Sequence, residues 1–275
     1  MINRMLSKLG YRLVPGNKYR AGRRSQSKRT LTRILSAFNV DITRVTANSA
    51  SLPADMDDLF RTLYPMVQHM TCVPFEPAYA TYQATKYIAK ANISGAVVEC
   101  GVWLGGMSRL ILDSLHSYGD VERDVYFFDT FSGMVSPGVA DEDFSGRSAS
   151  LDYDRFRKMG IGWYSAGLAE VQANLAASPY PAERMHFVQG GVEETIPENA
   201  PQDIALLRLD TDWYESTHHE MIHLFPRLVK GGVLIVDDYG SFKGARKAVD
   251  DYLTKIKVEM LLVRTGGPVI GIKQS

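Results

Sequence analysis

The second part of the chain, from Ala96 onwards, alternates short apolar runs with segments whose apolar residues recur at helical spacing. The apolar runs predict strands, and the segments between most of them predict helices. The expected strands are Ala96–Cys100, Val125–Asp129, His186–Gln189, Ile204–Asp210, Val233–Asp237, Val258–Val263 and Val269–Lys273. The expected helices are Met107–Ser117, Leu168–Ala177, Thr217–Val229 and Ala245–Lys255. This alternation predicts an α/β fold with a doubly wound, mostly parallel seven-stranded sheet.

The two ends of this pattern differ from its middle. Only Arg264 to Pro268 separate the last two strands, which is too short for a crossover helix, so we expect an antiparallel C-terminal hairpin. Before the first strand, apolar residues at helical spacing predict helices over Asp55–Val67 and Pro77–Lys90. Leu31–Asn48 has weak helical character. We therefore expect a helical N-terminal extension.

A glycine-rich turn follows the first expected strand, within Val97–Arg109 (VVECGVWLGGMSR). Gly101 and Gly105 let the backbone turn tightly and approach a ligand closely. Such a turn presents free N–H groups where open α/β sheets bind ligands. Glu99 lies at the strand tip, where a carboxylate can hold a cationic or hydroxylated group. A tight turn with no ligand is the alternative.

Two further features favour a nucleoside cofactor. Asp129 ends the second expected strand, and an acid there can hydrogen-bond a ribose hydroxyl pair. The turn from Gly190 to Glu193 follows the third expected strand and can let an adenine lie against the backbone. Dinucleotides and S-adenosylmethionine share these requirements, so neither feature chooses between them.

Four carboxylates follow two later strands. Asp210 and Asp212 lie in LLRLDTDWYEST, and Asp237 and Asp238 lie in IVDDYG. If the strands are neighbours, the carboxylates converge and repel one another unless a cation neutralises them. Oxygen ligands suit Mg²⁺, Mn²⁺ or Ca²⁺. Helix capping is the alternative role, since Thr217 with Glu220 fits a capping box.

Charge is distributed unevenly along the chain. The 275 residues include 31 basic and 31 acidic side chains, but Met1–Val40 holds ten basic residues and no acidic one. The rest of the chain therefore carries 21 basic against 31 acidic residues. We expect a basic arm over residues 1–50 and a catalytic domain over residues 51–275. The arm is interpreted as a solvated tail. The alternatives are docking onto an acidic protein surface, contact with an anionic membrane, and an organellar transit peptide. A nucleic acid partner is not favoured.

Two cysteines, Cys72 and Cys100, cannot form a disulfide framework and suggest a reducing compartment, so we expect a cytoplasmic protein. No apolar run approaches the roughly 18 residues of a transmembrane helix. The long segment from about residue 131 to 165 is rich in glycine and charge, which is typical of a substrate lid.

Together these motifs resemble the macrocin-type (TylF/MycF) O-methyltransferases. The resemblance is carried by VVECGVWLGGMSR, FDTFSGM, LLRLDTDWYEST, GGVLIVDDYG and ARKAVDDY, and it covers roughly Pro77–Ser275. The arm from Met1 to about Asn48 is not part of the shared pattern, and Met134–Met159 matches only loosely. The resemblance implies a Rossmann-like class I methyltransferase that transfers a methyl group from S-adenosylmethionine to a sugar hydroxyl, with Mg²⁺ or Mn²⁺. The acceptor could be an antibiotic sugar, another secondary metabolite or a glycan, and a homo-oligomer, at least a dimer, is expected.

Residue roles follow from the matching positions. Asp210, Asp237 and Asp238 would hold the metal, with Asp210 as the first candidate for the general base, Asp212 as the second, and Tyr239 shaping the substrate side. The implied cofactor contacts are Glu99, Gly101, Val102, Gly105, Ser108, Asp129, Ser132, Gly191, Val192, Glu193 and Asp210.

Two other functions fit parts of the pattern. Asp210-Thr211-Asp212 is also a DxD motif, as metal-dependent glycosyltransferases use to hold a nucleotide sugar. The other alternative is a methyltransferase-like protein without catalysis that binds a partner through its basic arm.

Overall fold

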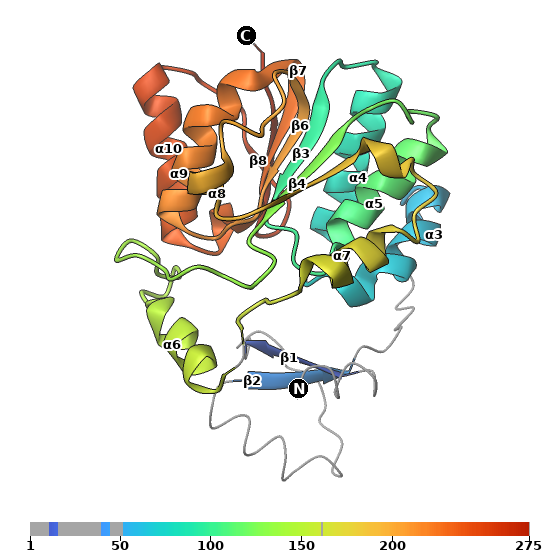
Figure 1. Ribbon diagram of the computed structural model, residues 1–275. Helices are drawn as coiled ribbons and strands as arrows, with labels where there is room; N and C mark the ends of the chain where they lie inside the picture. The colour runs from blue at the N-terminus through green and yellow to red at the C-terminus, as the bar shows by residue number, and fades with distance from the viewer. Residues whose placement is uncertain (1–10, 16–39, 45–51, 161, 275) are drawn as a thin grey trace. The chain divides into compact units, whose positions relative to one another are not determined.

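The computed structural model in Figure 1 describes residues 11–15, 40–44, 52–160 and 162–274. The chain divides into two compact units, Met1–Ser51 and Leu52–Ser275. In the first unit, β1 (Tyr11–Pro15) pairs antiparallel with β2 (Val40–Arg44). The weak helix expected over Leu31–Asn48 is therefore wrong at β2, whose alternating VDITR sequence suits a strand. The rest of that segment lies outside the described residues.

The second unit contains a seven-stranded sheet in the order β5-β4-β3-β6-β7-β9-β8. Its strands are β3 (Ala96–Cys100), β4 (Val125–Asp129), β5 (Met185–Gln189), β6 (Ile204–Leu209), β7 (Leu228–Val236), β8 (Val263–Arg264) and β9 (Val269–Ile272). In this order, the five strands β5, β4, β3, β6 and β7 pair in parallel. Strand β9 is antiparallel to both of its neighbours, β7 and β8. The predicted fold class, including its C-terminal hairpin, is confirmed.

Helices cover both faces of the sheet (Figure 1). One face carries α4 (Phe75–Lys90), α5 (Gly106–Ser117) and α7 (Leu168–Leu175), and the other carries α8 (Val192–Thr195), α9 (Tyr214–His223) and α10 (Lys243–Ile256). Because both faces are covered, every residue of β3 and β6 is buried. The N-terminal helical extension consists of α3 (Asp58–Val67) and α4, which pack with α5 in one apolar cluster. Within the described residues, no helix is long and apolar enough to cross a bilayer.

Several elements differ from the sequence-based predictions: β7 begins at Leu228 instead of Val233, and α8 was not predicted. The last predicted strand before the hairpin turn is reduced to β8, and Val258, Met260 and Leu262 pack on the core as irregular chain. The segment expected to be a loop contains α6 (Ser150–Lys158). The bounds of α9 also differ from the prediction.

Helix α9 begins three residues before the predicted start, so Thr217 lies inside it and donates its N–H to the Trp213 carbonyl at 3.0 Å. The capping box of Thr217 and Glu220 is therefore wrong. The helix also ends earlier than predicted, because Pro226 follows and cannot continue the hydrogen-bonding pattern.

The turn after β3 lies directly against the end of β6. Gly101 has φ +83°, and a Cβ atom there would lie 2.0 Å from the Asp210 carbonyl oxygen. The Asp210 N–H in turn donates to the Cys100 carbonyl at 2.8 Å. The glycine turn and the acidic strand end are thereby held side by side.

We expect Gly101→Ala to lower the free energy of unfolding by about 3 kcal/mol or more, because it adds a left-handed alanine and a backbone collision. Gly119→Ala is the matched control, since Gly119 has φ +76° and nothing within 4 Å of an added Cβ. Its loss should be only about 1–2 kcal/mol. Urea denaturation measures both, and equal losses would contradict the collision.

Candidate active site

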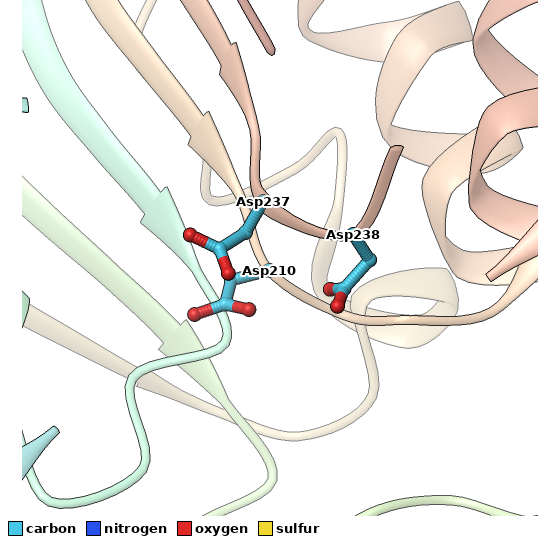
Figure 2. A group of neighbouring side chains, drawn as sticks. All are labelled: Asp210, Asp237 and Asp238. Carbon is cyan, nitrogen blue, oxygen red and sulfur yellow. The ribbon is translucent and has the colours of Figure 1, made fainter. Parts of the chain in front are cut away.

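Three carboxylates lie together where β6 and β7 end (Figure 2). Asp210 directly follows β6, and Asp237 and Asp238 begin the 3-10 turn after β7. The two strands are parallel neighbours, with Leu209 opposite Val236, so their ends reach the same edge. Each of the three residues offers an oxygen, and these oxygens lie within 4.8 Å of one another. The convergence of these carboxylates expected from the sequence is present.

A buried arginine holds this edge of the sheet. Arg208 is only 1% exposed, and it donates to Glu99 Oε1 at 2.8 Å, Asp210 Oδ2 at 2.8 Å and Asp237 Oδ1 at 2.5 Å. These contacts join the ends of β3, β6 and β7. Sequence reasoning missed this residue, although one cation inside the apolar run LLRL was a signal that a buried anion lies nearby.

The carboxylates outnumber the positive charge that faces them. Burial and the charge of Asp210 raise the pKa of Asp237 to about 7, although Arg208 opposes the rise. Burial raises the pKa of Asp212 to about 7 as well, and burial beside Asp212 raises the pKa of Asp238 far above its usual range. The cluster is therefore short of cationic charge within the described residues.

The donor set fits a hard divalent cation. Arg208 uses one oxygen each of Asp210 and Asp237, which leaves the second oxygen of each carboxylate for an ion. Asp238 Oδ2 is buried and has no hydrogen-bond partner among the described residues. An orphaned buried oxygen beside two other carboxylates is the environment that Mg²⁺ or Mn²⁺ can satisfy.

The glycine turn is organised by Asp129. One oxygen of this carboxylate accepts from the Val102 N–H at 2.7 Å and the Trp103 N–H at 3.0 Å, and the other accepts from the Phe131 N–H at 2.7 Å. Asp129 therefore fixes the loops after both β3 and β4. The expectation that the turn leaves its N–H groups free is wrong at Val102 and Trp103. Its predicted contact with a ribose stays a prediction.

Glu99 lies deeper than the sequence suggested. It is 1% exposed, accepts from Arg208 and from Ser108 Oγ, and burial raises its pKa. These contacts make Glu99 part of the support beneath the turn. The cofactor contacts predicted for Glu99 and Ser108 stay predictions.

The other predicted site residues lie at the periphery of this edge. Val192 is buried at the start of α8, next to Gly191, while Glu193 accepts from Ser216 Oγ at 2.7 Å. Ser132 accepts from Ser165 Oγ through its carbonyl at 2.9 Å. The Tyr239 hydroxyl donates to Asp250 at 2.7 Å, so this side chain is held against α10.

The predicted lid, residues 131–165, is fastened to the turn after β6. Asp141 is buried and accepts from the Tyr214 N–H at 2.8 Å, and the Trp213 indole donates to the Val135 carbonyl at 3.1 Å. Trp163 packs on Trp213 with ring centroids 5.9 Å apart. The segment thus lies beside Asp212, but its action as a lid stays a prediction.

The sheet order, the glycine turn after β3 and the terminal hairpin define the fold of the class I methyltransferases. The family model described as macrocin-O-methyltransferase (TylF) matches residues 25–266, and the chain belongs to this family. The resemblance found in the sequence is confirmed. The match begins within the basic arm, so the arm is not wholly outside the shared pattern.

Several named O-methyltransferases are relatives of this chain. The chain is 31% identical to demethyldecarbamoylnovobiocin O-methyltransferase of Streptomyces niveus over 64% of each chain. It is 32% identical to a tetracenomycin-rhamnosyl 4'-O-methyltransferase of Streptomyces olivaceus over 69% of each chain. Among solved structures, the O-methyltransferase NovP superposes with a TM-score of 0.66 and 26% identity, over 75% of this chain and 83% of that one. The match to demethyldecarbamoylnovobiocin O-methyltransferase spans less than two thirds of that enzyme's length.

We expect Arg208→Met to lower the free energy of unfolding by about 3–5 kcal/mol, because it leaves buried carboxylates without their cation. The loss should be smaller at pH 5 than at pH 8. A carboxyl such as Asp237, whose pKa of about 7 is above its unfolded value, destabilises the fold increasingly as the pH rises towards 7.

Chemical denaturation at the two pH values measures this difference. Arg61→Met is the control, because Arg61 pairs with Asp58 at the surface and that pair contributes little. A loss for Arg208→Met as small as the control's would contradict the role of the guanidinium.

Proposed function

We propose that this chain is an S-adenosylmethionine-dependent O-methyltransferase that acts on a sugar hydroxyl and uses a divalent cation. The observation that supports the proposal most is the Asp210, Asp237 and Asp238 cluster beside the glycine turn, in a member of the macrocin-O-methyltransferase family. The glycine turn suits the cofactor, and the carboxylates suit a cation with the acceptor oxygens.

The three carboxylates are the residues that would hold Mg²⁺ or Mn²⁺. An ion bound there would lower the pKa of a hydroxyl group attached to it. Arg208 would keep Asp210 and Asp237 oriented, because it is bonded to both. This orientation costs nothing at the moment of reaction, which is how preorganised sites contribute to rate.

Asp210 and Asp212 are the two candidate general bases. Asp210 is already bonded to Arg208 and is a cation ligand in this proposal. Burial raises the pKa of Asp212 to about 7, and a carboxylate with a raised pKa is a better proton acceptor. We therefore place proton removal from the acceptor hydroxyl on Asp212, which reverses the order of preference drawn from the sequence.

The turn that Asp129 organises would hold the cofactor, and the cofactor would supply the methyl group. Gly101 and Gly105 both have left-handed backbones, which glycine adopts without strain and which let the turn be this tight. The acceptor would enter between this turn and residues 131–165. The relatives' names point to a glycoside of a secondary metabolite.

Calorimetric titration tests the cofactor and the cation together. The protein should bind S-adenosylmethionine, and it should bind Mg²⁺ in a manner that EDTA abolishes. The same titration with UDP-glucose should give no heat. Binding of UDP-glucose that needs the metal, without a response to S-adenosylmethionine, would overturn the proposal in favour of a DxD glycosyltransferase.

Asp212→Asn should lower methyl transfer by about 100-fold or more, the usual effect of losing a general base. Its affinity for S-adenosylmethionine should stay within about threefold of the native value. Transfer of radiolabelled methyl to a panel of glycosylated secondary metabolites measures the first quantity. Glu122→Gln, an exposed carboxylate on another surface, is the control, and full activity of Asp212→Asn would assign the proton to another group.

A further inference from the structure

A further acidic side chain, outside the carboxylate cluster, is buried near it. Glu220, on α9, is 0% exposed, and its Oε2 accepts from Thr211 Oγ1 at 3.1 Å. Its Oε1 is buried and has no hydrogen-bond partner among the described residues. Glutamate is rarely buried to this extent, so the residue calls for an explanation.

The contacts of Glu220 join three elements of the site. Thr211 stands between Asp210 and Asp212 in the chain. On its other side Glu220 interacts with the thiol of Cys100, the last residue of β3. One side chain of α9 therefore touches both strand ends that carry the glycine turn and the acidic turn.

Glu220 supplies hydrogen bonds there without adding charge. Burial raises its pKa well above the ordinary value for glutamate, which favours the neutral carboxyl. A neutral group can donate as well as accept, and it does not increase the repulsion among the four aspartates above it. Glutamine can replace such a group, whereas an apolar side chain cannot.

The turn that Glu220 contacts needs such support. Asp212 has φ +65°, in the left-handed region that non-glycine residues rarely adopt. The Trp213 N–H donates to the Thr211 carbonyl at 2.8 Å, which closes the turn tightly. A backbone of this kind persists where its surroundings determine it. The hydroxyl of Thr211, held by Glu220, is one such determinant.

We propose that Glu220 is a positioning residue for the cation site: through Thr211 it fixes the turn that presents Asp210 and Asp212. The inference rests on the cation site proposed above. Without the contact between Glu220 and Thr211, the turn relaxes and the carboxylates lose their mutual placement. Cation affinity then falls, as it does when groups behind metal ligands are removed.

Mn²⁺ binding to the full chain tests the proposal without a methyl acceptor. Free Mn²⁺ is measured by electron paramagnetic resonance during titration of the native protein, Glu220→Gln, Glu220→Met and Thr211→Val. We expect Glu220→Gln to bind within about threefold of the native affinity. Glu220→Met and Thr211→Val should each bind about tenfold more weakly. A double variant that combines these two substitutions should bind no more weakly than Glu220→Met.

Asp113→Asn is the matched control. Asp113 is also a buried carboxylate on a helix, but it pairs with Arg109 in α5. Thermal unfolding is recorded for every variant. A residue that only fills the core would change the unfolding temperature and leave Mn²⁺ affinity unchanged, as expected for Asp113→Asn. If Glu220→Met fails to fold, Thr211→Val still decides, because it removes only the hydroxyl.

The outcomes separate the two proposals. A native protein that binds no Mn²⁺ overturns the cation site, and the role of Glu220 with it. Mn²⁺ binding by the native protein that both Glu220→Met and Thr211→Val leave unchanged overturns the positioning role alone. Loss of binding in Glu220→Gln equal to that in Glu220→Met also overturns it, because the amide keeps the hydrogen bonds.

Discussion

The guanidinium of Arg208 is the contact on which the acidic edge of the sheet depends. It is buried at the end of β6 and bonds carboxylates from β3, from the end of β6 and from the start of the turn after β7. Without a cation there, the carboxylates would repel one another in a medium that screens charge poorly. Burial, together with repulsion from neighbouring aspartates, raises the pKa values of Asp212, Asp237 and Asp238. The fold thus keeps an incompletely neutralised cluster, which suits a divalent ion.

The site is built from contacts between strand ends rather than from one loop. Gly101 allows the turn after β3 to lie against Asp210, and Asp129 ties that turn to the loop after β4. Beneath them, Glu220 reaches from α9 to Thr211. The parallel order of the strands brings these groups to one edge, where open α/β sheets carry their ligands. The family's fold therefore supplies the location, and a few buried polar contacts supply the geometry.

Much of this arrangement could be predicted from local sequence. Apolar runs of strand length and helical spacing gave six of the seven strands close to their positions, and the short Arg264–Pro268 link gave the hairpin. The acids at strand ends gave the cluster. The roles of Arg208 and Glu220 could not be predicted, because they depend on which strands are neighbours and on the phase of α9. The capping box predicted for Thr217 and Glu220 was wrong for the same reason. Helix α9 begins three residues earlier than predicted, and Glu220 is therefore a buried carboxyl inside the helix.

The aromatic contacts around this edge have a consequence for spectroscopy. The chain has three tryptophans, and they occupy the glycine turn (Trp103), residues 131–165 (Trp163) and the acidic turn (Trp213). The ring centroid of Trp163 lies 5.9 Å from that of Trp213 and 6.0 Å from that of Tyr164. The ring centroid of Tyr164 lies in turn 5.3 Å from that of Trp103. The intrinsic tryptophan emission of the whole protein therefore originates from its candidate active site. A ligand that binds there would shift the emission wavelength or change the fluorescence intensity. Ligand binding can therefore be followed without an added label.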